Sequence, residues 1–167
     1  MSSGLHSNGY MQSALVLQHP RHAEALGAAL AARVANLGAQ AVLSPALGGI
    51  VIGHEVARAL GVRAMFAERS ASRVLELRRG FALAPGERIL VVEDVLSTGG
   101  STRETIDVAR QAGGVVVGAA AIVDRSGGLI DLGVPYQTLV QLSLPIYQPE
   151  ICPLCRENIP ILKPGSR

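Results

Sequence analysis

The sequence predicts an α/β fold with a central, mostly parallel sheet flanked by helices. Short apolar runs typical of strands alternate along the chain with longer stretches typical of helices. The clearest strand, 88–95, is apolar on both faces, as expected in the middle of a parallel sheet. The chain has 167 residues, 49% hydrophobic and 17% charged, so it can bury one sizeable core without disulfides. We therefore expect a single domain over 1–167, with its core at about 20–144.

The first half of the chain is expected to contain two helices and two strands after a polar, turn-rich start. Pro20 suits the first turn of the first helix, and Gly38 and Gly61 follow the two helix ends. Gly48 and Gly49 are expected to turn the chain just before the second helix. By residue number, the polar start covers 1–13, the helices cover 20–37 and 50–60, and the strands cover 41–46 and 63–68.

The second half begins with an Arg-rich stretch, 69–80, that is either a loop or a hairpin with 74–77 as one arm. After the central strand, the Gly-rich turn at the start of 97–113 leads into a helix. Two further strands are expected at 115–125 and 136–144, and the Pro-rich tail from Pro145 is expected to be irregular.

Composition excludes several classes of function. The net charge is only +2 and aromatic residues make up 3%, with no Trp, which argues against a nucleic-acid partner. The start of the chain lacks the features of a signal peptide, and no apolar run is long enough for a membrane span. We therefore expect a cytoplasmic protein without a membrane partner, and its mild positive charge is compatible with a small anionic substrate.

The strongest motif is ILVVEDVLSTGGSTRE at 89–104, where a buried strand ends in the adjacent carboxylates Glu93 and Asp94. The small residues 97–101 can turn backbone N–H groups and hydroxyls toward an anion at the start of the following helix. Glycine lets a phosphate approach the backbone closely. The carboxylates would repel a phosphate, so they are expected to accept hydrogen bonds from sugar hydroxyls or to hold water around Mg²⁺. This combination suits a phosphorylated ribose.

This segment resembles the motif that binds 5-phosphoribosyl 1-pyrophosphate (PRPP) in type I phosphoribosyltransferases, and within them most resembles the orotate phosphoribosyltransferases. Four further segments carry the narrower resemblance. They are SGLHSNGYMQ (3–12), SPALGGIVIG (44–53), AIVDRSGG (121–128) and CPLCRENIPILKPGSR (152–167). The resemblance implies the type I phosphoribosyltransferase fold, with a small hood formed by 1–19 and 145–167.

The resemblance also implies the roles of individual residues toward PRPP. Glu93 and Asp94 would bind the ribose hydroxyls, and the loop after them would hold the 5′-phosphate. Mg²⁺ would be the cofactor, carried by PRPP and water near these carboxylates without direct protein ligands. The residues so implied to bind PRPP are Leu47, Gly48, Gly49, Glu93, Asp94, Thr98, Gly99, Gly100 and Ser101.

For the base and the catalytic loop, the resemblance implies two further sets. Ser97, Arg125 and Tyr10 would contact orotate, with the Arg125 guanidinium facing its carboxylate. Arg69 and Arg73 would act with Asp94 as catalytic residues, on a loop at 68–80 that in this family commonly closes over a neighbouring subunit's site. A homodimer that transfers phosphoribose from PRPP to orotate, giving orotidine 5′-monophosphate and pyrophosphate, is therefore implied.

The sequence departs from the family pattern in two places. Relatives carry about one helix before the Ser-Gly segment, and this chain is expected to lack it. The loop at 68–80 contains no Lys, although relatives use a lysine there, so its arginines would have to neutralise the pyrophosphate. Three alternatives stay open: a phosphoribosyltransferase for a purine base, a PRPP-binding regulator without turnover, and an inactivated paralogue.

Cys152 and Cys155 form a single CxxC motif, which is half a zinc site or a redox pair. A complete zinc site would need a second subunit or a histidine, and the four histidines are scattered at 6, 19, 22 and 54. The sequence favours small buried thiols in a packed tail.

Overall fold

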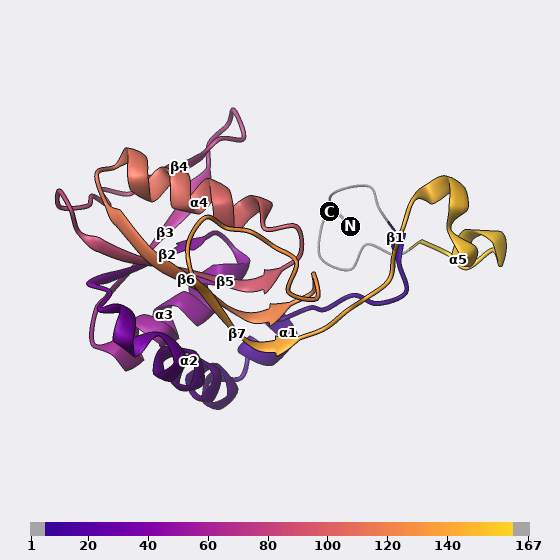
Figure 1. The fold of residues 1–167 in the computed structure, drawn as a ribbon, viewed down its shortest axis with the longest axis horizontal. Coiled ribbons are helices and arrows are strands. Elements are labelled where there is room, and N and C mark those ends of the chain that lie inside the picture. The colour runs from indigo at the N-terminus through magenta and orange to yellow at the C-terminus, as the bar shows by residue number, and fades with distance from the viewer. Residues whose placement is uncertain (1–5, 162–167) are drawn as a thin grey trace.

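A computed structural model describes residues 6–161 of the chain as an α/β body with a small lobe beside it (Figure 1). The body is built on a six-stranded sheet with the order β4-β3-β2-β5-β6-β7. Its strands are β2 (Ala41–Pro45), β3 (Arg63–Arg69), β4 (Leu75–Leu77), β5 (Arg88–Leu96), β6 (Val115–Asp124) and β7 (Tyr136–Gln141). Only β4 runs antiparallel to its neighbour, so the mostly parallel sheet is confirmed.

Helices cover both faces of this sheet (Figure 1). On one face, α2 and α3 bury Leu30 and Ile52 against strand residues such as Leu90. On the other face, α4 buries Ile106 against Val91. The helices are α1 (Ala14–Leu17), α2 (Pro20–Val34), α3 (Gly48–Leu60), α4 (Gly100–Gln111) and α5 (Pro153–Arg156), with 3₁₀ turns η1 (Ala35–Leu37) and η2 (Pro149–Ile151).

Several expectations need correction at the level of elements. Gly48 and Gly49 do not turn the chain before a helix but form the first turn of α3 itself, because neither has a side chain to clash there. The last strand ends at Gln141 rather than at 144. The short helix α1 lies between the turn-rich start and the first expected helix, and the tail contains the short helix α5; the sequence predicts neither. For 69–80, the hairpin alternative is the one observed, since β4 pairs with β3.

A separate two-stranded sheet joins the two ends of the described chain. Strand β1 (His6–Ser7) pairs antiparallel with β8 (Ile146–Tyr147), with His6 opposite Tyr147. Figure 1 shows this small sheet and α5 lying to one side of the α/β body. Residues 1–5 and 162–167 of the hood expected from the sequence lie outside the described residues.

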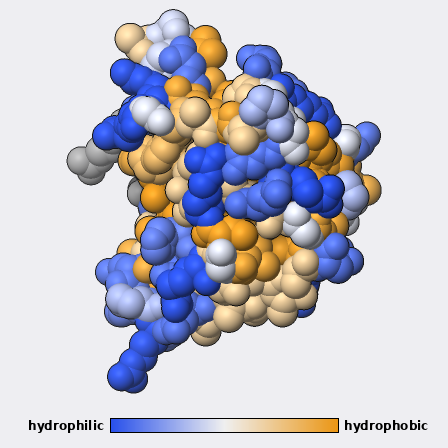
Figure 2. Space-filling model, turned by 90° about the vertical axis from the view of Figure 1, so that its left-hand side faces the viewer, coloured by the Kyte–Doolittle hydropathy of each residue, from blue (hydrophilic) through white to orange (hydrophobic). Residues whose placement is uncertain are grey.

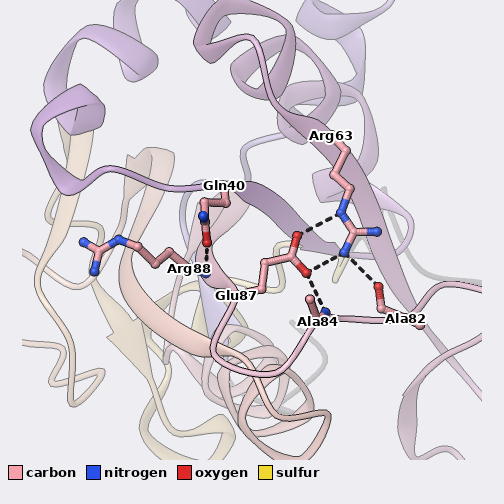
Figure 3. A network of polar contacts seen from close by, with 6 residues as sticks. All are labelled: Gln40, Arg63, Ala82, Ala84, Glu87 and Arg88. Atoms are coloured by element: carbon pink, nitrogen blue, oxygen red, sulfur yellow. Dashed lines mark hydrogen bonds and ion pairs between the residues drawn. The ribbon is translucent and has the colours of Figure 1, made fainter.

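The end of the molecule facing away from this lobe interleaves hydrophilic and apolar side chains (Figure 2). At the starts of β3 and β5, Arg63 donates to both carboxylate oxygens of Glu87, at 2.9 and 2.6 Å (Figure 3). The hydrogen bonds from Arg63 lower the pKa of Glu87 below its ordinary value. Gln40, directly before β2, accepts from the backbone N–H of Arg88 in the same region, so polar contacts connect the starts of these neighbouring strands.

Within the part of the chain that the structure describes, no helix combines the length and the apolar character that crossing a membrane requires.

Candidate active site

The end of β5 and the start of α4 enclose a pocket of about 310 Å³. β5 is buried through its middle and delivers its two carboxylates at its carboxyl end, where ligands bind in parallel α/β sheets. Gly99 precedes α4 with a φ of +75°, and a Cβ there would lie 2.8 Å from Ile130 Cγ2, so glycine is required at this turn. The lining residues are Glu93, Val95, Leu96, Ser97, Thr98, Gly99, Gly100, Ser101, Thr102 and Glu104.

Glu93 is the titratable group of this pocket with an altered pKa. Its side chain is half-buried and accepts a hydrogen bond of 2.7 Å from the hydroxyl of Thr102 in α4. Burial raises the pKa of Glu93 to about 7, although the hydrogen bond from Thr102 lowers it, and the negative charges of Asp94 and Glu104 act in the same direction as burial. The carboxyl group therefore changes its charge near neutral pH.

Asp94 faces the other side of β5 and does not line this pocket. Its carboxylate accepts a hydrogen bond from the Ser13 hydroxyl, immediately before α1. It also lies against the first residue of α3, because a Cβ at Gly48 would be 2.8 Å from Asp94 Oδ1. The two adjacent carboxylates therefore contact different segments, Glu93 on the α4 side and Asp94 on the α1 and α3 side.

The predicted pyrophosphate loop lies at the amino terminus of α3. Leu47 directly precedes the helix and its side chain is 83% exposed. The first turn of a helix has N–H groups without intrahelical partners, so it can bind an anion. Gly49 packs so closely on β5 that a Cβ would lie 3.0 Å from the Val92 carbonyl oxygen. This close packing brings the start of α3 next to Asp94.

Arg125 follows β6 directly and is almost fully buried, with 7% of its surface exposed. Its Nη2 donates to the Gly9 carbonyl at 3.2 Å, and its backbone N–H donates to the Leu96 carbonyl at 2.8 Å. Its Nε is buried and has no hydrogen-bond partner among the described residues. Gly9 directly precedes Tyr10, and Leu96 directly precedes Ser97. These two hydrogen bonds therefore bring together the three segments that are expected to contact orotate.

Asp124 fixes the backbone next to Arg125. It is fully buried and accepts hydrogen bonds from the Ser126 N–H at 2.7 Å, the Ser126 hydroxyl at 2.6 Å and the Gly128 N–H at 3.1 Å. The Tyr136 hydroxyl donates to it at 3.3 Å, and burial together with the Asp124 charge raises the pKa of Tyr136. Asp124 therefore anchors the turn that positions the Arg125 guanidinium.

Arg69 and Arg73 lie at a second pocket of about 340 Å³, between the β3–β4 hairpin and α4. Arg69 forms an ion pair of 2.8 Å with Glu104 and donates to the Arg73 carbonyl at 2.7 Å. Glu104 lines both pockets, so the hairpin adjoins the Glu93 pocket through this one residue. Within this chain, the structure does not bring Arg73 into contact with Asp94.

The sequence does not predict the contacts of three residues that position this site, Ser13, Thr102 and Asp124. Ser13 lies in the predicted polar start, and no local pattern relates it to Asp94, which lies 81 residues away. Thr102 follows the Gly-rich loop, nine residues after Glu93, so the strand–loop–helix pattern is the signal that would have identified it.

Comparison with known proteins identifies relatives that match over most of the chain. A family model described as a phosphoribosyl transferase domain matches residues 13–133. An orotate phosphoribosyltransferase of Pelotomaculum thermopropionicum is 55% identical over 167 residues, covering 100% of this chain and 87% of that protein. One from Thermotoga maritima is 46% identical over 167 residues, covering 100% of this chain and 89% of that protein.

Solved structures show the same architecture. The Mycobacterium tuberculosis orotate phosphoribosyltransferase in complex with PRPP superposes with a TM-score of 0.68 at 26% identity, covering 82% of each chain. An adenine phosphoribosyltransferase from Thermoanaerobacter pseudethanolicus has a TM-score of 0.71 at 16% identity, covering 84% of this chain and 97% of that one. At that identity the second likeness concerns the fold alone.

Proposed function

The chain belongs to the phosphoribosyltransferase family and, within it, to the orotate phosphoribosyltransferases, and from this we infer that it transfers the 5-phosphoribosyl group of PRPP to orotate. The products are orotidine 5′-monophosphate and pyrophosphate, a step of pyrimidine biosynthesis. The observation that carries the choice of base is the buried Arg125, whose Nε has no partner among the described residues. A guanidinium in that position is well suited to a planar carboxylate such as that of orotate.

We propose that PRPP spans the two sides of β5. Its 5′-phosphate binds at 98–101, where hydroxyls and backbone N–H groups meet the amino terminus of α4. Its ribose hydroxyls donate to Glu93 and Asp94, and its pyrophosphate binds the N–H groups at the start of α3 beside Leu47. The contact between Gly48 and Asp94 supports this arrangement, because it places the proposed pyrophosphate and ribose positions next to each other.

Mg²⁺ is the cofactor we propose for PRPP. The donors at the end of β5 fit it, because Glu93 and Asp94 supply carboxylate oxygens, the ligands that Mg²⁺ prefers. When bound with PRPP, the ion neutralises charge on the departing pyrophosphate. Glu93 and Asp94 hold the hydrated ion and the ribose in place in this proposal, and they supply no direct proton transfer.

The base site needs orientation rather than acid–base catalysis. Orotate is anionic, so its N1 can attack C1 of the ribose as the bond to pyrophosphate breaks. Arg125 would hold the orotate carboxylate while Ser97 and Tyr10 contact the ring. Positioning of the two reactants and positive charge near the leaving group then supply most of the rate enhancement. We assign that charge to Arg69 and Arg73, carried to a neighbouring subunit's site in a homodimer.

The first test follows the loss of orotate's ultraviolet absorbance with PRPP and Mg²⁺, with adenine, guanine and xanthine as parallel acceptors. We expect the wild-type chain to turn over orotate and none of the three purines. The Asp94→Asn variant should not turn over orotate. Turnover with a purine in place of orotate would support the purine-specific alternative. PRPP binding without turnover on any base would support a regulator or an inactivated paralogue.

The second test isolates Arg125. We expect Arg125→Lys to raise the KM for orotate by roughly 10- to 100-fold, because an ammonium cannot form the paired hydrogen bonds of a guanidinium. The KM for PRPP should change little. Arg156→Lys is the matched control, since Arg156 is exposed on α5 and should leave both values unchanged. Equal effects of Arg125→Lys on both substrates would contradict the assignment to the base.

A further inference from the structure

The small lobe beside the α/β body has almost no apolar core of its own. We call residues 6–12 and 145–161 the terminal lobe; it contains β1, β8, η2 and α5 (Figure 1). Of its residues whose burial the structure describes, only Cys152 is buried. Segments with so little buried surface usually need a disulfide, a metal or a partner to be stable.

Three metal-binding side chains meet in this lobe. The ligand atoms of His6, Cys152 and Cys155 all lie within 4.8 Å of one another. Cys155 Sγ is 3.2 Å from His6 Nδ1, although the two residues are 149 positions apart in the sequence. The pairing of β1 with β8 brings them together, since it places His6 opposite Tyr147, shortly before the CxxC motif.

We propose that His6, Cys152 and Cys155 bind a zinc ion that fastens the two ends of the chain together. Thiolate and imidazole ligands favour Zn²⁺ over the hard cation Mg²⁺, and two cysteines separated by two residues are a common half of a zinc site. Zn–S bonds near 2.3 Å and Zn–N bonds near 2.0 Å would separate tetrahedral ligand atoms by about 3.5–3.8 Å. The observed cluster needs only small side-chain adjustments to reach that spacing.

Among the described residues, no carboxylate joins the cluster of His6, Cys152 and Cys155. The chain has no cysteine besides Cys152 and Cys155, and its other histidines stand at 19, 22 and 54, at or within α2 and α3. The three ligands therefore leave the fourth tetrahedral position to a water molecule. On binding, the Sγ–H bonds of both thiols break, two zinc–sulfur bonds form, and two protons pass to solvent. No electron is transferred in this step.

Two rival interpretations account for less of the arrangement. A disulfide between Cys152 and Cys155 would give no role to the imidazole beside them. Thiols that merely pack would be expected among apolar neighbours, whereas Cys155 is half-buried and contacts a histidine nitrogen. The convergence of three ligands from opposite ends of the chain is what favours a metal.

The site lies close in sequence to the proposed base-binding segment. Gly9, three residues after His6, accepts the hydrogen bond from Arg125, and Tyr10 follows it. A zinc ion on His6 would hold this segment against the tail and so limit its movement over the base site. The metal site itself is independent of the proposed reaction, because it rests only on the three ligands.

The test begins with the wild-type chain, purified under reducing conditions and incubated with equimolar Zn²⁺. We expect about one tightly held zinc per chain, and an X-ray absorption spectrum with two sulfur and two nitrogen or oxygen neighbours. Replacing zinc by Co²⁺ should give the intense near-ultraviolet thiolate-to-cobalt absorption of a two-cysteine site. A chain that holds no zinc while both thiols titrate as free, or an intact mass lower by the two hydrogens of a disulfide, would overturn the proposal.

Variants then identify the ligands. We expect Cys152→Ser, Cys155→Ser and His6→Gln to hold zinc at least tenfold more weakly, while His54→Gln, an exposed histidine in α3, binds it as the wild type does. If the cysteine variants fail to fold, the wild-type absorption spectra alone decide the question. Unchanged zinc affinity in all three ligand variants would refute the site. Since metal content is measured without substrates, this result is separate from success or failure of the orotate assay.

Discussion

Glu93 combines a structural cost with its proposed binding role. Its carboxyl group is half-buried beside Asp94 and Glu104, and burial raises its pKa from the ordinary value of 4.5 to about 7. The folded chain therefore binds this proton more tightly than the unfolded chain does. Its contribution to stability is most favourable below pH 4.5 and is lost as the pH rises toward 7. A ribose hydroxyl that donates to the ionised carboxylate would offset part of this cost.

At the residue scale we predict that Glu93→Gln stabilises the free chain at pH 8. The gain should be at most about 3 kcal/mol, from about 1.4 kcal/mol per pKa unit, and it should vanish near pH 4.5. PRPP binding should weaken in the same variant, because the amide accepts hydrogen bonds less strongly than a carboxylate.

Urea unfolding at pH 4.5 and pH 8 measures the first effect, and PRPP titration at pH 8 measures the second. Glu76→Gln is the control, since Glu76 is exposed on β4 and does not line the Glu93 pocket, so its change should leave the stability difference small. If the Glu93→Gln variant is no more stable than the parent at pH 8, burial does not destabilise the ionised carboxylate of Glu93.

At the scale of an element, the start of α3 shows how two adjacent glycines serve different purposes. A side chain at Gly48 would meet the carboxylate of Asp94, which can rotate away. A side chain at Gly49 would meet the Val92 carbonyl oxygen and the Ser44 and Pro45 side chains, which are fixed in the sheet. The first glycine therefore protects the proposed PRPP site, and the second permits the packing of α3 on β5.

We predict that Gly48→Ala and Gly49→Ala separate these two purposes. Gly49→Ala should lower the free energy of unfolding by roughly 1–3 kcal/mol, because the added methyl group overpacks a rigid contact. Gly48→Ala should leave stability nearly unchanged but weaken PRPP binding, because it displaces Asp94. Denaturant unfolding and PRPP titration of both variants check this, and each variant is the control for the other. If the two variants had the same stability and the same affinity for PRPP, the two glycines would not have separate roles.

At the scale of the whole molecule, the hairpin of β3 and β4 lies at the edge of the sheet, separated from β5 by β2 (Figure 1). Arg69 pairs with Glu104 of its own chain, while Arg73 is exposed. Both observations are compatible with the proposed homodimer, in which this hairpin supplies positive charge to a neighbouring site.

If the sites are shared, two inactive variants should complement each other. We predict that an Arg69→Ala/Arg73→Ala double variant, mixed in equal amounts with Asp94→Asn and allowed to exchange subunits, recovers about one quarter of wild-type activity. Half of the dimers are then hybrids, each with one intact site. The orotate assay measures the recovery, and sedimentation checks that dimers form.

The control mixes Asp94→Asn with a chain that carries both the hairpin and the Asp94 changes, which leaves no intact site in any dimer. No recovery in the first mixture, despite proven subunit exchange, would mean that each hairpin serves its own chain.

Sequence patterns are enough to predict the α/β class, the order of the main elements and the strand–loop–helix that carries Glu93 and Asp94. Those features are local, because burial periodicity, glycines and caps act within about fifteen residues of the chain. The helices α1 and α5 are only four residues long, so their sequences hold too little periodic pattern to predict them. The roles assigned to Leu47, Arg69 and Tyr10 stay predictions.

Contacts between residues far apart in the sequence come from the folded arrangement alone. It joined Ser13 to Asp94, Gly9 to Arg125, and His6 to the two cysteines. These contacts depend on the order of strands in the sheet and on the pairing of β1 with β8, and no local pattern encodes either. The CxxC motif illustrates the difference, since the chain alone favoured packed thiols and the fold added the histidine that turns the motif into a candidate metal site.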